Sequence, residues 1–186
     1  HPRHVGQVWN PPPAVQPCLH SVMRSVCAAG YCGRCESAEW VLDYSFTPFG
    51  RCRVGARSKT WEPRVAQEAH LYAPRTPYWE DLGTTGVPQT RGIFVSFSGG
   101  ESANLTALVG GKRYARFRDP EGRLGGLLER LLDIGLSAGQ SGFWTAQGVF
   151  CEVLSVLTAD TPMKGGLRVI TQIAAVPAHA DLHRAV

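Results

Sequence analysis

The 186-residue chain has no long hydrophobic run and little net charge. No apolar stretch approaches the ~18 residues that cross a bilayer as a helix, and no segment has the layout of a secretory signal peptide. The 19 basic and 15 acidic side chains leave a formal net charge of +4, too weak and too dispersed to attract nucleic acid by charge alone. The sequence therefore predicts a cytoplasmic chain with no membrane partner.

The composition is that of a folded domain, with 44% hydrophobic and 18% charged residues. Its length suits one domain, or one domain with an appendage. The chain starts at His1 instead of Met, and residues 181–186 read like the beginning of a helix. We therefore expect it to be part of a longer protein.

Six cysteines occur, at Cys18, Cys27, Cys32, Cys35, Cys52 and Cys151. Cys32-Gly-Arg-Cys35, with Cys27 ahead of it, is compatible with a zinc knuckle or a redox pair. A structural zinc site needs a second ligand pair, and a redox pair belongs at a strand-to-helix junction, whereas this motif reads as a glycine-rich turn. Reduced, unliganded thiols are favoured, but metal binding by these cysteines stays open.

Residues 1–17 read as a proline-rich arm, and residues 18–118 as a series of short strands. In the clearest strand, at 38–46, Trp40, Leu42 and Tyr44 alternate with Val41 and Asp43. Further strands are predicted at 20–27, 52–54, 58–61, 69–73, 93–97 and 113–118, with turns that include Gly86-Val87-Pro88. Short strands separated by Gly/Pro turns, without interleaved helices, favour an antiparallel barrel or sandwich.

Residues 119–162 predict two helices. Asp119-Pro120-Glu121 has the pattern of a helix start, and Ser141 is a candidate cap for a second helix that runs to about Thr158. The apolar stripes of this antiparallel pair either cover an open barrel face or form a dimerisation surface. The predicted dimerisation residues are Leu124, Leu128, Leu131, Phe150, Leu154 and Leu157. Residues 163–186 are predicted to be a linker.

Several segments carry a family resemblance. A strand at 39–44 precedes a hairpin at 50–54, then Glu62-Pro63-Arg64 and Ala73-Pro74-Arg75-Thr76-Pro77-Tyr78. This order resembles the sensor domain of the AraC/XylS transcription regulators, in which similar R-P-G-D and P-P-G-x-x-H pieces build a cupin-like barrel. The chain departs from that pattern after Pro63, where the Gly-Asp pair is missing, and at Tyr78, which stands at the family's histidine.

The resemblance implies a mainly β fold with α: a cupin-like double-stranded β-helix (jelly-roll) barrel at 18–118, then an antiparallel helical pair. It also implies that the chain senses a small-molecule effector, such as a sugar, and forms a homodimer. DNA would be bound only through a C-terminal helix-turn-helix domain absent from this chain. In this interpretation the arm folds over the ligand.

A ligand pocket is expected inside the barrel mouth. Aromatic side chains would stack on a ring, and charged or hydroxyl side chains would bind its polar groups. The expected ligand-binding residues are Arg34, Tyr78, Trp79, Glu80, Phe94 and Ser96.

An alternative is a metal-dependent cupin enzyme of the isomerase or dioxygenase type. Cupin-like barrels often hold a metal on two or three histidines and a carboxylate. Here no H-x-H occurs, and of the six histidines only His70 is central. We therefore expect that the chain is not an enzyme, with no catalytic residues, no metal and no cofactor.

Overall fold

The computed structural model describes residues 3–12, 14–27, 30–48, 50–83, 90–159, 163–164 and 167–170. The strands are β1 (Arg3–Val8), β2 (Cys18–Cys27), β3 (Cys32–Cys35), β4 (Trp40–Ser45), β5 (Arg51–Val54), β6 (Glu62–Pro63), β7 (Glu68–Tyr72), β8 (Tyr78–Asp81), β9 (Thr90–Ser98), β10 (Tyr114–Arg118), β11 (Met163–Lys164) and β12 (Leu167–Val169). The helices are α1 (Leu105–Val109), α2 (Arg123–Ala138) and α3 (Phe143–Thr158). None of the described helices is long and apolar enough to cross a membrane.

The strands pair as one long hairpin rolled on itself. β2 pairs with β9, β3 with β8, β4 with β7 and β5 with β6, all antiparallel. These strands form a large sheet, which contains the order β2-β9-β4-β7, and a small sheet with the order β3-β8-β5-β6. These nested pairs give the strand order of an eight-stranded jelly roll, the architecture of cupins. The predicted sheet-rich fold with two helices is therefore confirmed, and its strand order is that of a jelly roll.

Both ends of the described chain extend the large sheet. Six residues of the predicted arm, Arg3–Val8, form β1, which runs antiparallel along β2. At the opposite edge β10 pairs with β7, and β12 lies parallel to β10. Residues 163–164 and 167–170 therefore belong to the folded domain, and their prediction as linker is wrong because β12 hydrogen-bonds to β10 and to β11. The rest of the predicted linker, 165–166 and 171–186, and the predicted turn at 86–88 lie outside the described residues.

Three local predictions need correction. Residues 32–35, predicted as a turn, form β3, and the strand predicted at 58–61 is replaced by β6 at Glu62–Pro63. The strand region also contains a helix, α1, between β9 and β10. Short elements such as these depend on pairing with distant strands or packing on the core, which local sequence patterns do not encode.

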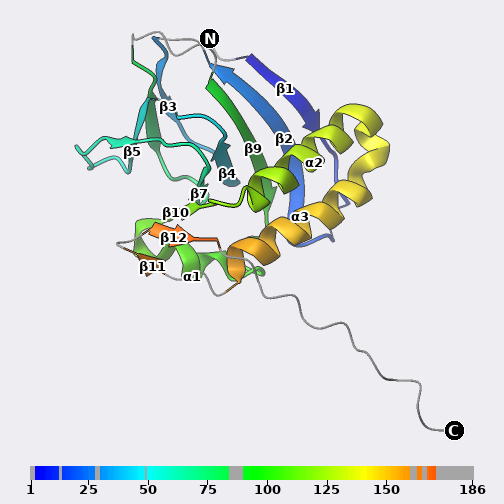
Figure 1. Ribbon diagram of the computed structural model, residues 1–186. Coiled ribbons are helices and arrows are strands. Elements are labelled where there is room, and N and C mark those ends of the chain that lie inside the picture. The colour runs from blue at the N-terminus through cyan, green and yellow to red at the C-terminus, as the bar shows by residue number, and fades with distance from the viewer. Residues whose placement is uncertain are drawn as a thin grey trace, which may run out of the picture.

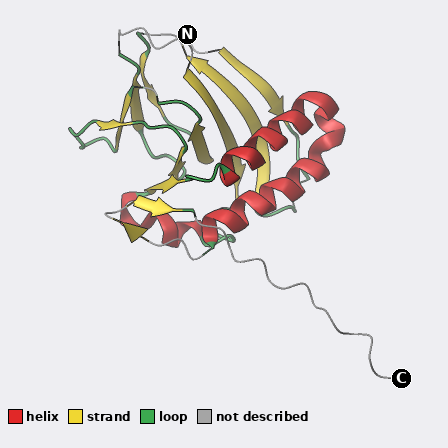
Figure 2. Ribbon diagram, viewed as in Figure 1, coloured by secondary structure: helices red, strands yellow, loops and turns green. Residues whose placement is uncertain are grey.

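The helical pair covers one face of the large sheet (Figures 1 and 2). α2 begins at Arg123, four residues after the predicted cap Asp119, whose carboxylate still accepts a hydrogen bond from the Gly125 amide at 3.0 Å. The same carboxylate accepts a hydrogen bond from the Tyr44 hydroxyl at 2.9 Å, which ties the start of α2 to β4. α3 ends at Thr158, where the sequence predicts its end.

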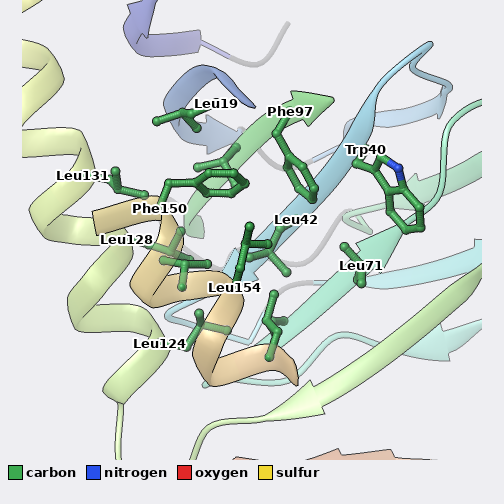
Figure 3. Packing of buried hydrophobic residues seen from close by; sticks show 14 of the residues in the cluster. Leu19, Trp40, Leu42, Leu71, Phe97, Leu124, Leu128, Leu131, Phe150 and Leu154 are labelled. Carbon is green, nitrogen blue, oxygen red and sulfur yellow. The ribbon is translucent and has the colours of Figure 1, made fainter. Parts of the chain in front are cut away.

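The apolar core lies between this helical layer and the large sheet (Figure 3). Leu42, Leu71 and Phe97 from the sheet are fully buried there, and Phe150 from α3 packs on Phe97 with ring centroids 4.9 Å apart. The predicted alternation in β4 is confirmed, because Trp40, Leu42 and Tyr44 belong to this core while Asp43 points to the other face.

The predicted dimerisation residues are part of the same core. Their exposed fractions are at most 6%, so their side chains pack against the chain itself: Leu124, Leu128, Leu131, Phe150, Leu154 and Leu157. The large apolar side chains that the helical layer exposes are instead Leu136, at 49%, and Trp144, at 64%. The homodimer stays a prediction, and a second copy would have to contact residues other than these six.

Candidate functional site

A cavity of about 490 Å³ lies on the opposite side of the large sheet from the helices. One wall comes from β2, β4 and β9, the other from β3 and β8, and β1 adds His4. The cavity is lined by His4, Ser21, Ser25, Tyr31, Arg34, Cys35, Glu36, Ser37, Glu39, Val41, Asp43, Tyr78, Glu80, Gly92, Phe94 and Ser96. Its size falls in the range of small-molecule sites.

Five of the six predicted ligand-binding residues lie on this cavity: Arg34, Tyr78, Glu80, Phe94 and Ser96. They come together because side chains alternate along a strand, so Tyr78 and Glu80 share one face of β8, and Phe94 and Ser96 share one face of β9. That these residues bind a ligand remains a prediction.

Trp79 is the exception. Lying between Tyr78 and Glu80 on β8, it points to the other face of the small sheet. There its ring lies under the guanidinium groups of Arg53, 4.3 Å from the ring centroid, and Arg34, at 5.8 Å. The sequence assigned Trp79 to the cavity by its neighbours, and strand alternation corrects that assignment.

The floor of the cavity holds a buried ionic cluster. One nitrogen of Arg64, Nη1, donates hydrogen bonds to Asp43 Oδ2 and to Glu80 Oε1, both at 2.6 Å. The Arg64 side chain is fully buried, whereas the carboxylates retain 13% and 12% exposure. Both acids also line the cavity, so a ligand there can reach them.

Arg64 and Asp43 were not among the predicted site residues. Arg64 was named only in the resemblance to an R-P-G piece. The available signal was Asp43 itself, a charged side chain within the apolar run of β4, because a buried carboxylate requires a partner.

Burial shapes the proton affinities in this cluster. Burial alone would lower the pKa of Arg64, but Asp43, Tyr72 and Glu80 raise it above its ordinary value, so the guanidinium stays charged. Burial raises the pKa of Glu80, Arg64 opposes this rise, and Asp43 adds to it. A carboxyl with a raised pKa, held in a cavity, is suited to exchange a proton with a ligand.

His70, the central histidine of the sequence, lies behind this cluster on β7. Its Nε2 is 2.7 Å from Glu68 Oε1, and its Nδ1 is 3.2 Å from the hydroxyls of both Tyr72 and Tyr114. Burial lowers the pKa of His70 to about 4, with Arg64 adding to the effect. Both ring nitrogens are therefore engaged within the protein, and the ring is neutral at pH 7.

The residues of the cavity do not fit a metal ion. A cupin metal centre needs histidine and carboxylate ligands that converge on one point. Among the residues that the structure describes, no three or more His, Cys, Asp or Glu side chains converge in this way. Where Asp43 and Glu80 approach each other, the cation between them is the Arg64 guanidinium.

No protein-family model and no curated protein matches the chain. Part of it is similar to solved structures of oxalate decarboxylase. A structure of the Bacillus subtilis enzyme at pH 4.6 has 10% identity and a TM-score of 0.36 over 46% of this chain and 22% of that one. Another structure concerns a structural element that modulates proton-coupled electron transfer in oxalate decarboxylase. It has 11% identity and a TM-score of 0.37 over 47% of this chain and 23% of that one.

The chain thus spans less than a quarter of the length of these matched structures. These structures are of enzymes, which contradicts the prediction that this chain is not an enzyme, and that prediction is withdrawn. The comparisons do not support the AraC/XylS assignment. At TM-scores below 0.5, they do not identify a reaction for this chain.

Proposed function

We propose that this chain is a cupin-like domain that binds a small, hydroxyl-rich molecule in the cavity and moves a proton on it, as an isomerase does. The observation that carries the proposal is the pair of cavity carboxylates, Asp43 and Glu80, held on one buried arginine nitrogen. The protein's own acid and base groups supply the chemistry, and no step requires a metal.

The lining of the cavity supports a neutral polyol or sugar as the ligand. Four carboxylates line it, from Glu36, Glu39, Asp43 and Glu80, and they accept hydrogen bonds from hydroxyl groups. Phe94 offers an aromatic face on which a sugar ring can stack. Arg34 also lines the cavity, but its guanidinium is paired with Glu36 and lies over the Trp79 ring. An anionic ligand would therefore meet a surplus of negative charge.

The roles of the cluster follow from its geometry. Glu80, as carboxylate, takes a proton from the carbon next to a ligand carbonyl, and the resulting carboxylic acid returns that proton to a neighbouring atom. Arg64 fixes the orientation of the Glu80 carboxylate through the 2.6 Å hydrogen bond. Asp43 balances the arginine charge when Glu80 is protonated.

A ligand response that involves the N-terminal arm is a second candidate function. His4 of β1 lines the cavity and packs edge-on against Phe94, with ring centroids 5.3 Å apart. A molecule that stacks on Phe94 would displace or reorient His4, and this would link cavity occupancy to β1.

The proton transfer can be tested by hydrogen exchange. The protein is incubated with a panel of aldoses and ketoses in D₂O, and deuterium incorporation next to the carbonyl is followed by NMR. We expect exchange with at least one sugar, and a loss of roughly 10²-fold or more in Glu80→Gln, the usual contribution of a general base. Glu121→Gln, which changes an exposed glutamate after β10, is the matched control and should exchange like the parent protein.

Thermal shifts with the same sugars separate binding from chemistry. A Glu80→Gln variant that still binds but no longer exchanges supports the proposal. A sugar that binds the parent protein without any exchange overturns the proton-transfer role, as does exchange that survives Glu80→Gln unchanged.

A further inference from the structure

A second set of polar residues, beside the cavity, is arranged as nucleophile, base and acid. Ser98 Oγ, at the end of β9, lies 3.0 Å from Nε2 of His20 on β2. The other ring nitrogen of His20, Nδ1, is bonded to Oε1 of Glu39, the residue immediately before β4. β9, β2 and the residue before β4 thus contribute one side chain each to a continuous Ser–His–Glu chain.

A β-bulge explains why His20 reaches Ser98. The pairing of β2 with β9 shifts between Leu19 and Ser21, so His20 is the extra residue. Leu19 and Val22 are both fully buried on the helix side, which leaves the two residues between them on the opposite face. Ser21 bonds to Ser96 at 2.8 Å, and His20 turns to the next serine along β9. Bulges often re-aim a side chain in this way at active sites.

The backbone around the three residues is held in place. The amide of Trp9 donates to the carbonyl of His20 at 2.8 Å, and the amide of Glu39 donates to Ser37 Oγ at 3.0 Å. Directly after Ser98 the chain turns at Gly99, whose φ of 71° favours glycine. A nucleophile that ends a strand at a tight turn is presented to solvent on a rigid support.

The group is also reachable. The side chains of His20 and Glu39 are 27% and 34% exposed, and Ser98 is half-buried. Glu39 lines the cavity, and so do Ser21 and Ser96 next to His20 and Ser98. A ligand in the cavity, or one approaching from solvent, can therefore come close to Ser98.

We propose that Ser98, His20 and Glu39 form a nucleophilic site that cleaves small esters. Ser98 Oγ attacks the ester carbonyl carbon while its proton passes to His20 Nε2. His20 returns this proton to the alcohol oxygen as the C–O bond breaks, and the acyl group stays on Ser98. Water, deprotonated in the same way by His20, then releases the acid and restores Ser98. Glu39 acts as a positioning residue that orients the imidazole through Nδ1. The reaction at this site does not use Glu80, although Glu39 also lines the cavity.

The test uses a fluorophosphonate, which forms a bond from phosphorus to an activated serine oxygen and expels fluoride. Mass spectrometry of peptides locates the label, and hydrolysis of p-nitrophenyl acetate measures turnover. We expect labelling at Ser98, no such label in Ser98→Ala, and a rate about 10⁴-fold lower in His20→Gln, the order of the loss found when a triad residue is changed. Ser102→Ala removes a nearby exposed hydroxyl, which bonds to the Gly99 carbonyl, and should label like the parent protein.

The positioning role of Glu39 has its own readout. Glu39→Gln should slow labelling strongly, and Glu39→Asp, which keeps the carboxylate, should restore part of the rate. The melting temperature of each variant establishes folding, and if His20→Gln fails to fold, the Glu39 pair carries the test. Absence of label at Ser98 in the folded parent protein overturns the proposal, as does a labelling rate that His20→Gln or Glu39→Gln leaves unchanged.

Discussion

The two faces of the large sheet differ sharply although both are buried. On β7 all five residues are buried, yet Ala69 and Leu71 belong to the apolar core on the helix side, while Glu68, His70 and Tyr72 lie on the side of the small sheet. The helix side is a continuous apolar core. The side toward the small sheet is a layer of hydrogen-bonded and charged groups. Burial of apolar area favours folding without directional constraint, whereas a buried polar layer is stable only if its partners are correctly placed. The helix side thus stabilises the fold, and the side toward the small sheet holds the polar side chains of the candidate site in place.

A charge introduced on the helix side should have the largest effect. Leu128 of α2 is fully buried, and Leu128→Asp would place a carboxylate among apolar side chains without a partner. We expect the domain to unfold, with a loss of more than about 4 kcal/mol. Trp144→Glu changes a side chain that is 64% exposed and should alter stability by less than about 0.5 kcal/mol.

Circular dichroism and size-exclusion chromatography of these two variants also test the predicted homodimer. A folded monomer from Leu128→Asp would contradict the view that this face is the chain's own core. A parent dimer that becomes a folded monomer in Trp144→Glu would place the contact between copies on the exposed side of the helical layer.

The apolar face was largely predictable from the sequence, and the polar face was not. Period-two alternation in residues 40–46 and the leucine spacing of 124–132 report directly which side chains are buried. They do not report whether a buried stripe contacts the same chain or another copy. The dimerisation residues were misassigned for that reason.

On the polar face, strand alternation brought Tyr78, Glu80, Phe94 and Ser96 to one cavity as expected. The Arg64 cluster joins residues from three separate segments, and the Ser98–His20 contact depends on a bulge. Contacts between residues 16 to 78 positions apart follow from strand order and register, and neither can be read from a single sequence.

Removal of the central cation should give the next largest effect. Arg64→Met leaves Asp43 and Glu80 buried close together with no guanidinium between them. Because removing one partner of a buried ion pair leaves uncompensated charge, we expect a loss of about 3–5 kcal/mol at pH 7 in urea unfolding.

The loss in Arg64→Met should shrink toward pH 5. Without Arg64, which lowers the pKa of Glu80, that pKa rises further, so the folded variant binds more protons than the unfolded chain and gains relative stability as the pH falls. Glu121→Gln, at an exposed site, controls for general charge effects. A penalty that stays constant between pH 7 and pH 5 would show that the carboxylates do not interact through Arg64.

The buried polar face should make the protein less stable as the pH falls below 6.5. The pKa of His70 is about 4 in the folded protein and 6.5 when unperturbed, because burial disfavours the imidazolium. Between these values the unfolded chain binds more protons, so stability falls as the pH drops from 6.5 to 4, by about 3 kcal/mol in total. His70→Gln should flatten this part of the profile in urea titrations taken at half-unit steps.

Glu80 provides a second test of this pH profile, because its contribution to stability changes with pH in the opposite direction to that of His70. Its pKa is raised in the folded state, so it contributes stability at low pH that is lost as the pH rises. Glu80→Gln should therefore make the stability fall more steeply as the pH drops. His70→Gln should instead flatten that fall. Burial raises the pKa of Glu68, but His70 and Arg116 more than offset this and lower it below its ordinary value of 4.5, so Glu68 acts at a more acidic pH. If both variants shift the profile in the same direction, the polar layer is not held by the hydrogen bonds described above, and the contrast between the two faces of the sheet fails.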